Sequence, residues 1–345
     1  MRKTIRWQKP LVIAAAGSLV AAIAFLLLAL ITARGLYDQR AAELWEAGGD
    51  DALSYAQVTV FLARDTGFNY DSLMKLRYDI DEKYIEDGIS SPSESEDARL
   101  WTDAASAEGS VTAERNGNSI NASVTAVTGD YFRFHPNKMM SGQYLNREEA
   151  SKDVVLLDWN AAWRLFGGYD VAGMQVEVGG RSCIVGGVFE KDAEDGAENR
   201  VIVSYELYEL MNSSAELGVL EFILPNTITD HGLQTVSELV GVSDENRTII
   251  ENTSRFKFKS LFKAATNFGD TIAHSKSIAL PYYENRARVA EFRGGVFLLL
   301  AAVFAILPLT CVVMALVKIY RRRSGIWSSV KAKFKQKNTK NREHP

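Results

Sequence analysis

Three glycine pairs lie close together in the stretch WRLFGGYDVAGMQVEVGGRSCIVGGVFE, which runs from Trp163 to Glu190. Glycine-rich loops can bind phosphate, but a P-loop needs G-x-x-x-x-G-K-[S/T], and a dinucleotide motif needs a strand before its glycines and a helix after them. Neither context occurs here, so no nucleotide and no other cofactor is predicted. Gly179-Gly180 instead fits a hairpin turn between two alternating segments. Gly167-Gly168 fits the end of a short helix.

No other residue pattern in the chain matches a known kind of catalytic or metal site. An acidic loop at Lys191–Arg200 has the glycine of a calcium loop, but Lys191 occupies the first ligand position and cannot coordinate a cation, so solvated charge is the better interpretation. The sequence contains neither an HExxH motif nor a GxSxG motif among its four histidines and its serines. We therefore expect no metal, no catalytic residues and no enzyme activity.

Two long apolar stretches dominate the organisation of the chain. Residues 11–33 and 294–317 contain no charged side chain, and the first charges after them are Arg34 and Lys318. About 20 apolar residues suffice to cross a bilayer as a helix. The first stretch is longer than the ~7–15 apolar residues of a signal peptide and lacks a good cleavage site after it. Both are predicted to be transmembrane helices.

The charges around these stretches predict the orientation of the protein. Of the 39 Lys and Arg residues, four precede the first stretch and ten follow the second, which leaves 25 between them. Of the 43 Asp and Glu residues one follows the second stretch, so the segment between carries 42 acids and a net charge of −17. Because short basic flanks stay in the cytoplasm, residues 1–10 and 318–345 are expected inside and residues 34–293 outside the plasma membrane. No nucleic acid is expected as a partner.

The exterior segment has helices and strands in a mixed order. Alternation predicts a strand at Ala56–Ala63, and an apolar stripe predicts a helix that begins at Asp71 as N-cap and stops at Gly88. A second strand and helix follow near Leu217–Pro225 and Asp230–Gly241. Strands are predicted between these units, with a short helix among them, at 119–127, 153–157, 174–178, 182–188 and 201–204. The sequence thus predicts an α+β domain: an α/β subdomain at about 50–100 and 215–290, with a β-rich subdomain at about 101–214 inserted.

The basic tail after the second stretch has an amphipathic pattern. Apolar side chains recur on one helical face and lysines on the other, which is typical of a helix that lies on the inner leaflet. The alternatives are a disordered tail and a docking site for a cytoplasmic partner. The residues predicted to contact the membrane or a partner are Arg321, Arg322, Arg323, Ile326, Trp327, Val330 and Phe334.

The stretch Val127–Glu190 resembles the MacB-like periplasmic core domain of ABC-transporter permeases of the MacB/FtsX type. Its features occur in the order of that family: Tyr131-Phe132, Gly142, Val154-Val155, Leu165-Phe166-Gly167 and Val185-Gly186-Gly187-Val188. The resemblance implies a porter-like α/β subdomain with an inserted β-rich one, dimerisation, and a cytoplasmic ABC ATPase as partner. Family members ordinarily have four membrane spans, whereas two are predicted here, so a second permease subunit is expected.

Two functions therefore remain open at the level of sequence. The favoured one is a permease-like subunit of a MacB-type ABC transporter or mechanotransmission complex, whose exterior domain couples ATPase action to an envelope substrate or partner. The alternative is a membrane-anchored extracytoplasmic protein for sensing, binding or scaffolding, without transport. Neither substrate nor transport direction follows from the residues.

Overall fold

The computed structural model describes residues 8–34, 36–45, 54–90, 99–145, 153–193, 195–228, 230–267, 269 and 278–340; for 8, 33, 34 and 322–340 it describes the backbone alone. The chain divides into two compact units. The first consists of Met1–Thr32 and Arg293–Pro345, and the second of Ala33–Phe292.

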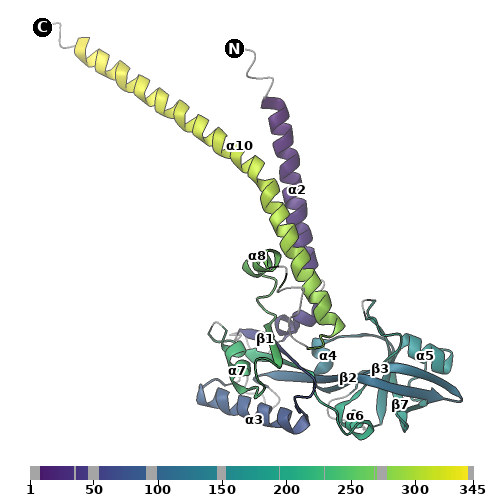
Figure 1. Cartoon of the computed structure of the whole chain (residues 1–345). Helices are drawn as coiled ribbons and strands as arrows, with labels where there is room; N and C mark the ends of the chain where they lie inside the picture. The colour runs from purple at the N-terminus through teal and green to yellow at the C-terminus, as the bar shows by residue number, and fades with distance from the viewer. Residues whose placement is uncertain are drawn as a thin grey trace. The chain divides into compact units, whose positions relative to one another are not determined.

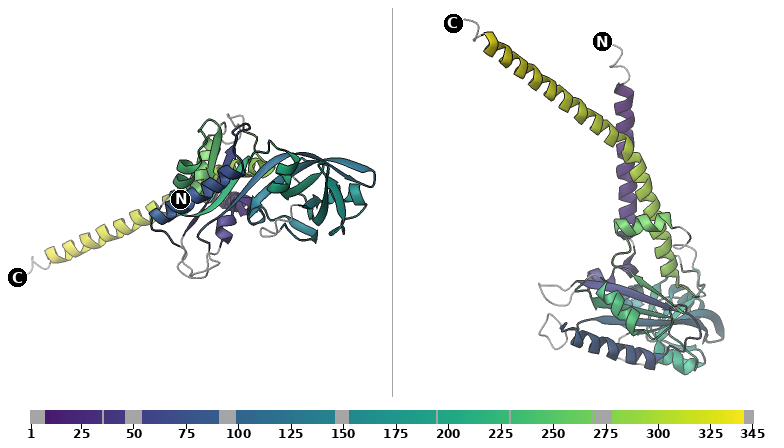
Figure 2. Two further views of the ribbon diagram at one scale, coloured as in Figure 1. Left: turned by 90° about the horizontal axis from the view of Figure 1, so that it is seen from below. Right: turned by 60° about the vertical axis from the view of Figure 1, so that its left-hand side comes forward.

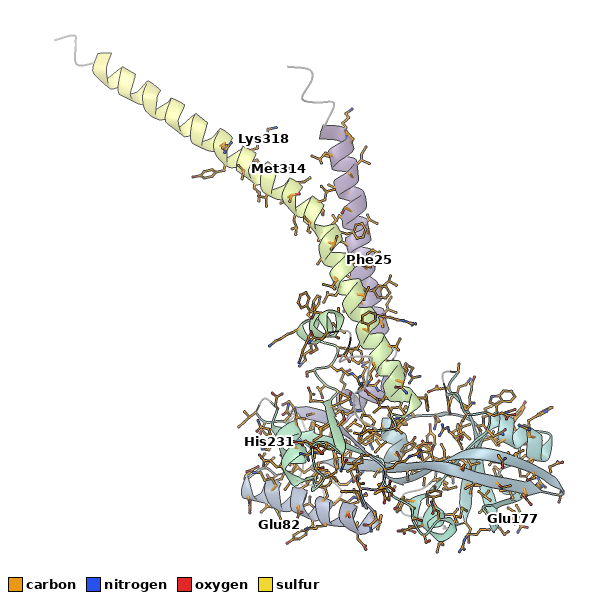
Figure 3. The ribbon with its side chains drawn as sticks, in the orientation of Figure 1. Phe25, Glu82, Glu177, His231, Met314 and Lys318 are labelled. Carbon is orange, nitrogen blue, oxygen red and sulfur yellow. The ribbon has the colours of Figure 1, made fainter. Side chains whose placement is uncertain are left out.

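The first unit contains two helices long and apolar enough to cross a membrane. Helix α2 spans Gln8–Arg34, and helix α10 spans Tyr282–Lys340, of which the part from Arg293 onward belongs to this unit. Where α2 and α10 lie side by side (Figure 1), the Phe25 ring of α2 stacks on Phe297 and Phe304 of α10, with centroids 6.3 and 5.6 Å apart. Figure 3 labels Phe25. The Ser18 hydroxyl also donates to the Phe304 carbonyl. Aromatic packing and this hydrogen bond therefore join the two helices side by side.

All ten strands found in the described part of the second unit belong to one sheet. The strand order is β10-β1-β9-β2-β3-β8-β5-β7-β4, and β6 pairs with both β2 and β7. The strands are β1 (Tyr55–Leu62), β2 (Thr102–Arg115), β3 (Asn118–Gly129), β4 (Lys138–Gly142), β5 (Val154–Asp158), β6 (Gln175–Val178), β7 (Arg181–Glu190), β8 (Arg200–Ser204), β9 (Val219–Pro225) and β10 (Arg247–Glu251). The sheet thus runs without a break through both predicted subdomains, and the boundary between these subdomains stays a prediction.

Helices cover both faces of this sheet (Figures 1 and 2). Besides the start of α10, the helices described in this unit are η1 (Tyr37–Gln39), η2 (Ala41–Leu44), α3 (Tyr70–Glu86), α4 (Tyr131–Phe134), α5 (Trp159–Phe166), α6 (Tyr205–Met211), α7 (His231–Leu239) and α8 (Phe258–Thr266). One core gathers side chains of α3, α5, α6 and α7, and a second core on the opposite face gathers those of η2 and α4. Adjacent residues of one strand divide between the cores; in β8, for example, Val201 and Val203 face the first core and Ile202 the second.

The local signals in the sequence account for most of these elements. The predicted apolar stripe of α3 is confirmed, because Leu73, Leu76, Ile80 and Tyr84 are its buried residues. Its predicted N-cap was wrong: the side chain of Asn69, not Asp71, accepts the hydrogen bond from the Ser72 amide. An N-cap needs extended backbone just before the first helical residue, and Asn69 has it while Asp71 is already helical.

The glycine pairs act as the turn prediction describes at two of the three sites. Gly179 and Gly180 both have positive φ, +57° and +76°, in the hairpin between β6 and β7. Gly167 ends α5 in the left-handed conformation at φ +75°. The third pair, Gly186-Gly187, lies within β7 instead, where a Cβ at Gly187 would come within 2.5 Å of Met139 and 2.8 Å of the Ser141 carbonyl. These two glycines allow a close approach between strands.

Candidate functional site

The most distinctive polar cluster of the second unit joins the two segments that lead to the apolar helices. Asp38 in η1 follows α2, and Arg286 in α10 precedes the apolar stretch of that helix. Their side chains form an ion pair, in which the Arg286 guanidinium donates to the Asp38 carboxylate. We call the cluster formed by Asp38, His135, Glu221, Arg286, Asp192 and Tyr282 the linker junction.

His135 connects this ion pair to the sheet. One ring nitrogen, Nδ1, lies 2.9 Å from Asp38 Oδ1, and the other, Nε2, lies 2.5 Å from Glu221 Oε2 of β9. The imidazole is only 5% exposed, and its ring lies near those of Tyr131 and Tyr283, with centroid distances of 4.7 and 4.3 Å. A buried charge is stable only when it is paired and hydrogen-bonded, as it is here on both sides.

The electrostatics of the junction keep His135 in its charged form. Burial alone would lower the pKa of the imidazole, but the carboxylates of Glu221 and Asp38 raise it to about 10. Burial likewise acts to raise the pKa of Asp38, and hydrogen bonding and charge from His135 and Arg286 hold it below its usual value. At neutral pH His135 is therefore an imidazolium that donates from both nitrogens. It is a cationic bridge between two carboxylates and not a general base.

Local sequence explains how the partners reach one another. In β9, Leu220, Phe222 and Leu224 face the first core, so alternation turns Glu221 to the opposite face. In β1 the same alternation turns Gln57 to that face, where its side chain is fully buried. The Gln57 amide oxygen accepts from the Ala41 amide at 2.8 Å, and its nitrogen donates to the Asp38 carbonyl at 2.5 Å. Strand β1 therefore holds the segment that carries Asp38.

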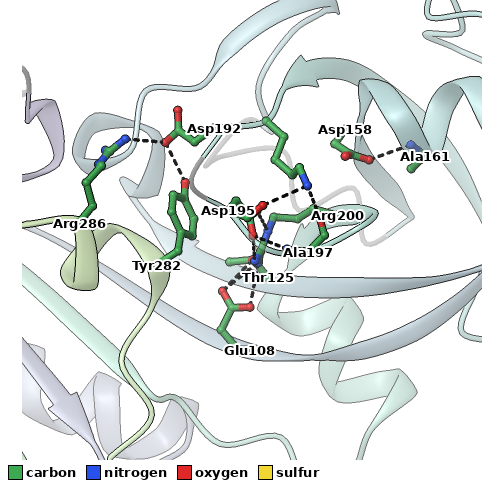
Figure 4. Close-up of polar contacts among 11 residues, drawn as sticks. Glu108, Thr125, Asp158, Ala161, Asp192, Asp195, Ala197, Arg200, Tyr282 and Arg286 are labelled. Atoms are coloured by element: carbon green, nitrogen blue, oxygen red, sulfur yellow. Dashed lines mark hydrogen bonds and ion pairs between the residues drawn. The ribbon is translucent and has the colours of Figure 1, made fainter. Parts of the chain in front are cut away.

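A second group of contacts extends the junction along α10 toward the loop before β8 (Figure 4). Asp192 accepts from the Tyr282 hydroxyl at 3.1 Å and from Arg286 Nη1 at 3.2 Å. The Tyr282 ring in turn lies 5.8 Å from the Arg200 guanidinium.

The loop Lys191–Arg200 was predicted to be solvated charge; this interpretation holds for Glu198, which is exposed, and was wrong for Asp195 and Arg200. Asp195 is 5% exposed and forms an ion pair with Arg200, which also binds Glu108 at 2.9 Å. The Lys191 ammonium donates to the carbonyls of Asp195 and Ala197. Lys191, Asp195 and Arg200 thus find their partners within the fold, which a count of acids and bases in sequence cannot show.

A third ion-pair cluster fixes the first turns of α10 from the side of α8. Arg255 binds Glu284 in bidentate geometry, at 2.7 and 2.9 Å, and its Nε donates to Glu291 at 2.9 Å. Glu284 also accepts from Arg288 at 2.7 Å. Arg255 and Glu284 are 6% and 2% exposed, so the cluster is a buried one. The beginning of α10 is therefore held by charged contacts on two sides.

A cavity of about 470 Å³ lies beside Arg200 and Tyr282. Its walls combine apolar side chains such as Leu217 and Leu280 with the Arg200–Glu108 ion pair. Among the described residues, no group of three or more His, Cys, Asp and Glu side chains is arranged to hold a metal ion.

The membrane-contact residues predicted from the tail are separate from this junction. Arg321 is exposed on α10, and the helical backbone continues through Arg322, Arg323, Ile326, Trp327, Val330 and Phe334 to Lys340. The side chains of those six residues lie outside the described part of the structure, so their contact with membrane or partner stays a prediction. None of the junction residues was identified from sequence, since Asp38, His135 and Glu221 are separated from one another by 86 positions or more.

The family model of the MacB-like periplasmic core domain matches residues 14–228. Because the match covers more than half of the 345 residues, the chain belongs to the MacB-like periplasmic core domain family, a family of ABC-transporter permease domains and not of typical enzymes. The resemblance noted in the sequence is thereby confirmed.

Two solved structures illustrate the likeness. The extracellular domain of the noncanonic ABC-type transporter YknZ from Gram-positive bacteria is 14% identical, with 56% of this chain and 99% of that chain covered and a TM-score of 0.39. The periplasmic region of MacB from Actinobacillus actinomycetemcomitans is 14% identical, with 57% and 89% covered and a TM-score of 0.42. No curated protein matches the chain.

Proposed function

We propose that the chain is a permease-like subunit of a MacB-type ABC transporter or mechanotransmission complex, in which the exterior domain couples the action of a cytoplasmic ATPase to an envelope substrate or partner. The observation that carries the proposal is the linker junction. The two segments that lead to the apolar helices bind each other through Asp38 and Arg286, and bind the sheet through His135 and Glu221.

This arrangement suits the transmission of a displacement. Paired and buried charges resist separation, because removing one partner leaves an uncompensated charge in a medium of low dielectric constant. A movement of either apolar helix would therefore be passed to β9 and α4 and not be absorbed in a loose linker. Family membership and the two apolar helices support the same function.

The proposed orientation places both termini in the cytoplasm. It is supported by the basic flanks of residues 1–10 and 318–345 and by the acidic segment between the apolar helices. In this orientation the tail from Arg321 to Phe334 would be available for the ATPase or for anionic lipid. A second permease subunit and a homodimer are further proposed partners.

The test has two parts and uses the full chain in its native membranes. Purification in a mild detergent should recover an ABC ATPase together with the chain, as identified by mass spectrometry. Hydrogen exchange of that complex should then differ between ATP and ADP in β9 and α4. Arg286→Gln should keep the ATPase bound and abolish the nucleotide-dependent difference, whereas Lys138→Gln, at an exposed ion pair with Glu190, should leave it unchanged.

Purification of the intact chain without any ATPase would contradict the proposal and favour the anchored binding or scaffold protein. In that case, deletion of residues 321–345 should leave the function of the protein intact. A nucleotide-dependent difference that survives in Arg286→Gln would remove the linker junction from the coupling path.

A further inference from the structure

Helix α8, Phe258–Thr266, exposes an apolar ridge. Leu261 and Ala264 are its buried residues, whereas Phe258 and Phe262 are 59% and 53% exposed. Residues four apart lie on the same face of a helix, so the two rings form one continuous surface. Phenylalanine has no polar group to hydrate, and two neighbouring exposed rings mark a surface that another apolar phase covers.

The same helix carries a local excess of positive charge. Lys257, Lys259 and Lys263 are all exposed, and no Asp or Glu occurs between Asn252 and Asn267. This basic segment belongs to an exterior region with a net charge of −17. The combination of aromatic ridge and flanking lysines matches the composition of helices that lie in a bilayer interface, where apolar side chains enter the acyl boundary and lysines contact phosphates.

The position of α8 along the fold agrees with such a role. Arg255, three residues before the helix, binds Glu284 and Glu291 of α10 and is itself buried. Glu291 precedes Gly294, the first residue of the apolar stretch, by three positions in one continuous helix. At about 1.5 Å per residue, this corresponds to less than one helical turn. The ion pairs thus tie the segment that begins α8 to the part of α10 that directly precedes the apolar stretch in sequence.

We propose that α8 is an interfacial membrane anchor of the exterior domain: Phe258 and Phe262 insert at the outer boundary of the bilayer, and Lys257, Lys259 and Lys263 bind the phosphates of anionic phospholipids. The anchor does not depend on an ATPase, because a scaffold protein with the same fold would present the same face.

The test measures the depth of α8 in full-length protein reconstituted into nanodiscs of phosphatidylcholine with phosphatidylglycerol. Cys183 and Cys311 are replaced by Ser and Ala, and a nitroxide is attached to a cysteine introduced by Phe262→Cys. The matched control is a nitroxide attached through Tyr78→Cys, at a 64% exposed position on α3. Power saturation should show the label at 262 more accessible to oxygen than to a soluble nickel chelate, and the label at 78 the reverse.

A second measurement needs no substitution. Trypsin should cleave after Lys257, Lys259 and Lys263 about tenfold more slowly in anionic nanodiscs than in detergent, since each lysine near an anionic surface is stabilised there. Cleavage after Lys75, on α3, should have the same rate in both. Nanodiscs of phosphatidylcholine alone should give an intermediate protection, because the two rings still insert.

Two results would overturn the proposal. One is a label at 262 that is as accessible to the nickel chelate as the label at 78, together with unprotected lysines. The other is a label that is immobilised only in the complex purified from native membranes and accessible to the chelate in nanodiscs. That second outcome would assign the ridge to a protein partner instead of lipid.

Discussion

The Asp38 carboxylate accepts a hydrogen bond from the Arg286 guanidinium across 248 positions of sequence. The pair joins the two ends of the second unit, because Asp38 lies shortly after α2 and Arg286 shortly before the apolar stretch of α10. His135 and Asp192 extend the contact to the rest of that unit. The second unit is thus held together by the two segments that lead to the apolar helices.

Loss of the Arg286 charge should destabilise the second unit. In Arg286→Gln, Asp38 keeps His135 but loses its second cation while it remains buried. We expect a loss of about 2–3 kcal/mol, below the range for a fully buried pair because Arg286 is 22% exposed. The corresponding fall in Tm, measured on the full chain in detergent, is about 4–12 °C. Lys138→Gln, which breaks a solvent-exposed pair, should change Tm by less than a third of this amount.

Replacement of His135 should change how stability depends on pH. The pKa of His135 is about 10 in the folded protein and near its ordinary value of 6.5 in the unfolded chain, so folding favours the protonated form. Its contribution is complete below pH 6.5 and is lost as pH rises toward 10. The Tm of the wild type should therefore fall over this interval, relative to that of His135→Gln.

The matched control for this pH profile is His231→Gln. His231 Nε2 lies 3.2 Å from Asp87 Oδ2, and its ring lies 5.8 Å from that of Tyr84, at a partly exposed site on α7 (Figure 3). Its variant controls for the loss of a histidine–carboxylate contact at a partly exposed site. Parallel profiles for the wild type and His135→Gln would show that His135 is neutral in the folded protein.

At the acidic end, the lowered pKa of Asp38 contributes stability above its ordinary pKa of 3.8, and this contribution is lost as pH falls further.

The glycines of the β-rich region differ in how much stability is lost when alanine replaces them, and one pair of variants measures this difference. Gly142 and Gly180 have nearly the same positive φ, +72° and +76°. A Cβ at Gly142 would lie 2.1 Å from the Gly186 carbonyl oxygen, whereas a Cβ at Gly180 meets nothing within 4 Å. Gly180→Ala should cost about 1 kcal/mol of stability through backbone strain alone. Gly142→Ala adds a clash with backbone and should cost about 3 kcal/mol or more.

These two variants are compared by the same thermal unfolding measurement on the full chain. Equal losses would mean that β4 can move away from β7, so that only the conformational strain remains. In that case, the spacing of Gly142 and Gly186-Gly187 would be a matter of turn formation and not of close strand contact.

Elements that depend on neighbouring residues were predictable from the sequence, whereas elements that depend on contacts between distant residues were not. Strand β1 and helix α3 were predictable because their alternation and apolar stripe occur within a short run of residues. Strand β2 was missed because its sequence, TDAASAEGSVTAER, consists of small and polar residues, and its core positions are mostly alanines. The central location of β2 between β9 and β3 is what makes it a strand.

The linker junction could not be predicted for a different reason. Alternation in β1 turns Gln57 and Thr59 to the face opposite Val58, and such a polar face normally meets water. Here it is covered, and Gln57 and Thr59 are 0% and 2% exposed. Which segment covers it depends on Asp38 and Ala41 from one end of the domain, and no local pattern in β1 encodes that pairing. Helix α8 was not predicted either, because a helix of nine residues gives only a short apolar stripe.

The Arg255 cluster provides a last prediction, which connects stability with the position of α8. In Arg255→Met, Glu284 keeps Arg288, but Glu291 loses the partner that ties it to α8. Because Arg255 and Glu284 are nearly fully buried, we expect a loss of about 3–5 kcal/mol. Trypsin cleavage after Lys257 and Lys259 should become faster at temperatures well below Tm, since the start of α8 is released locally. Arg164→Met, at the exposed ion pair with Glu198, should cost at most about 1 kcal/mol and leave this cleavage unchanged. Faster cleavage in both variants would indicate general unfolding, and unchanged cleavage in Arg255→Met would mean that packing of Leu261 and Ala264 alone holds α8 in place.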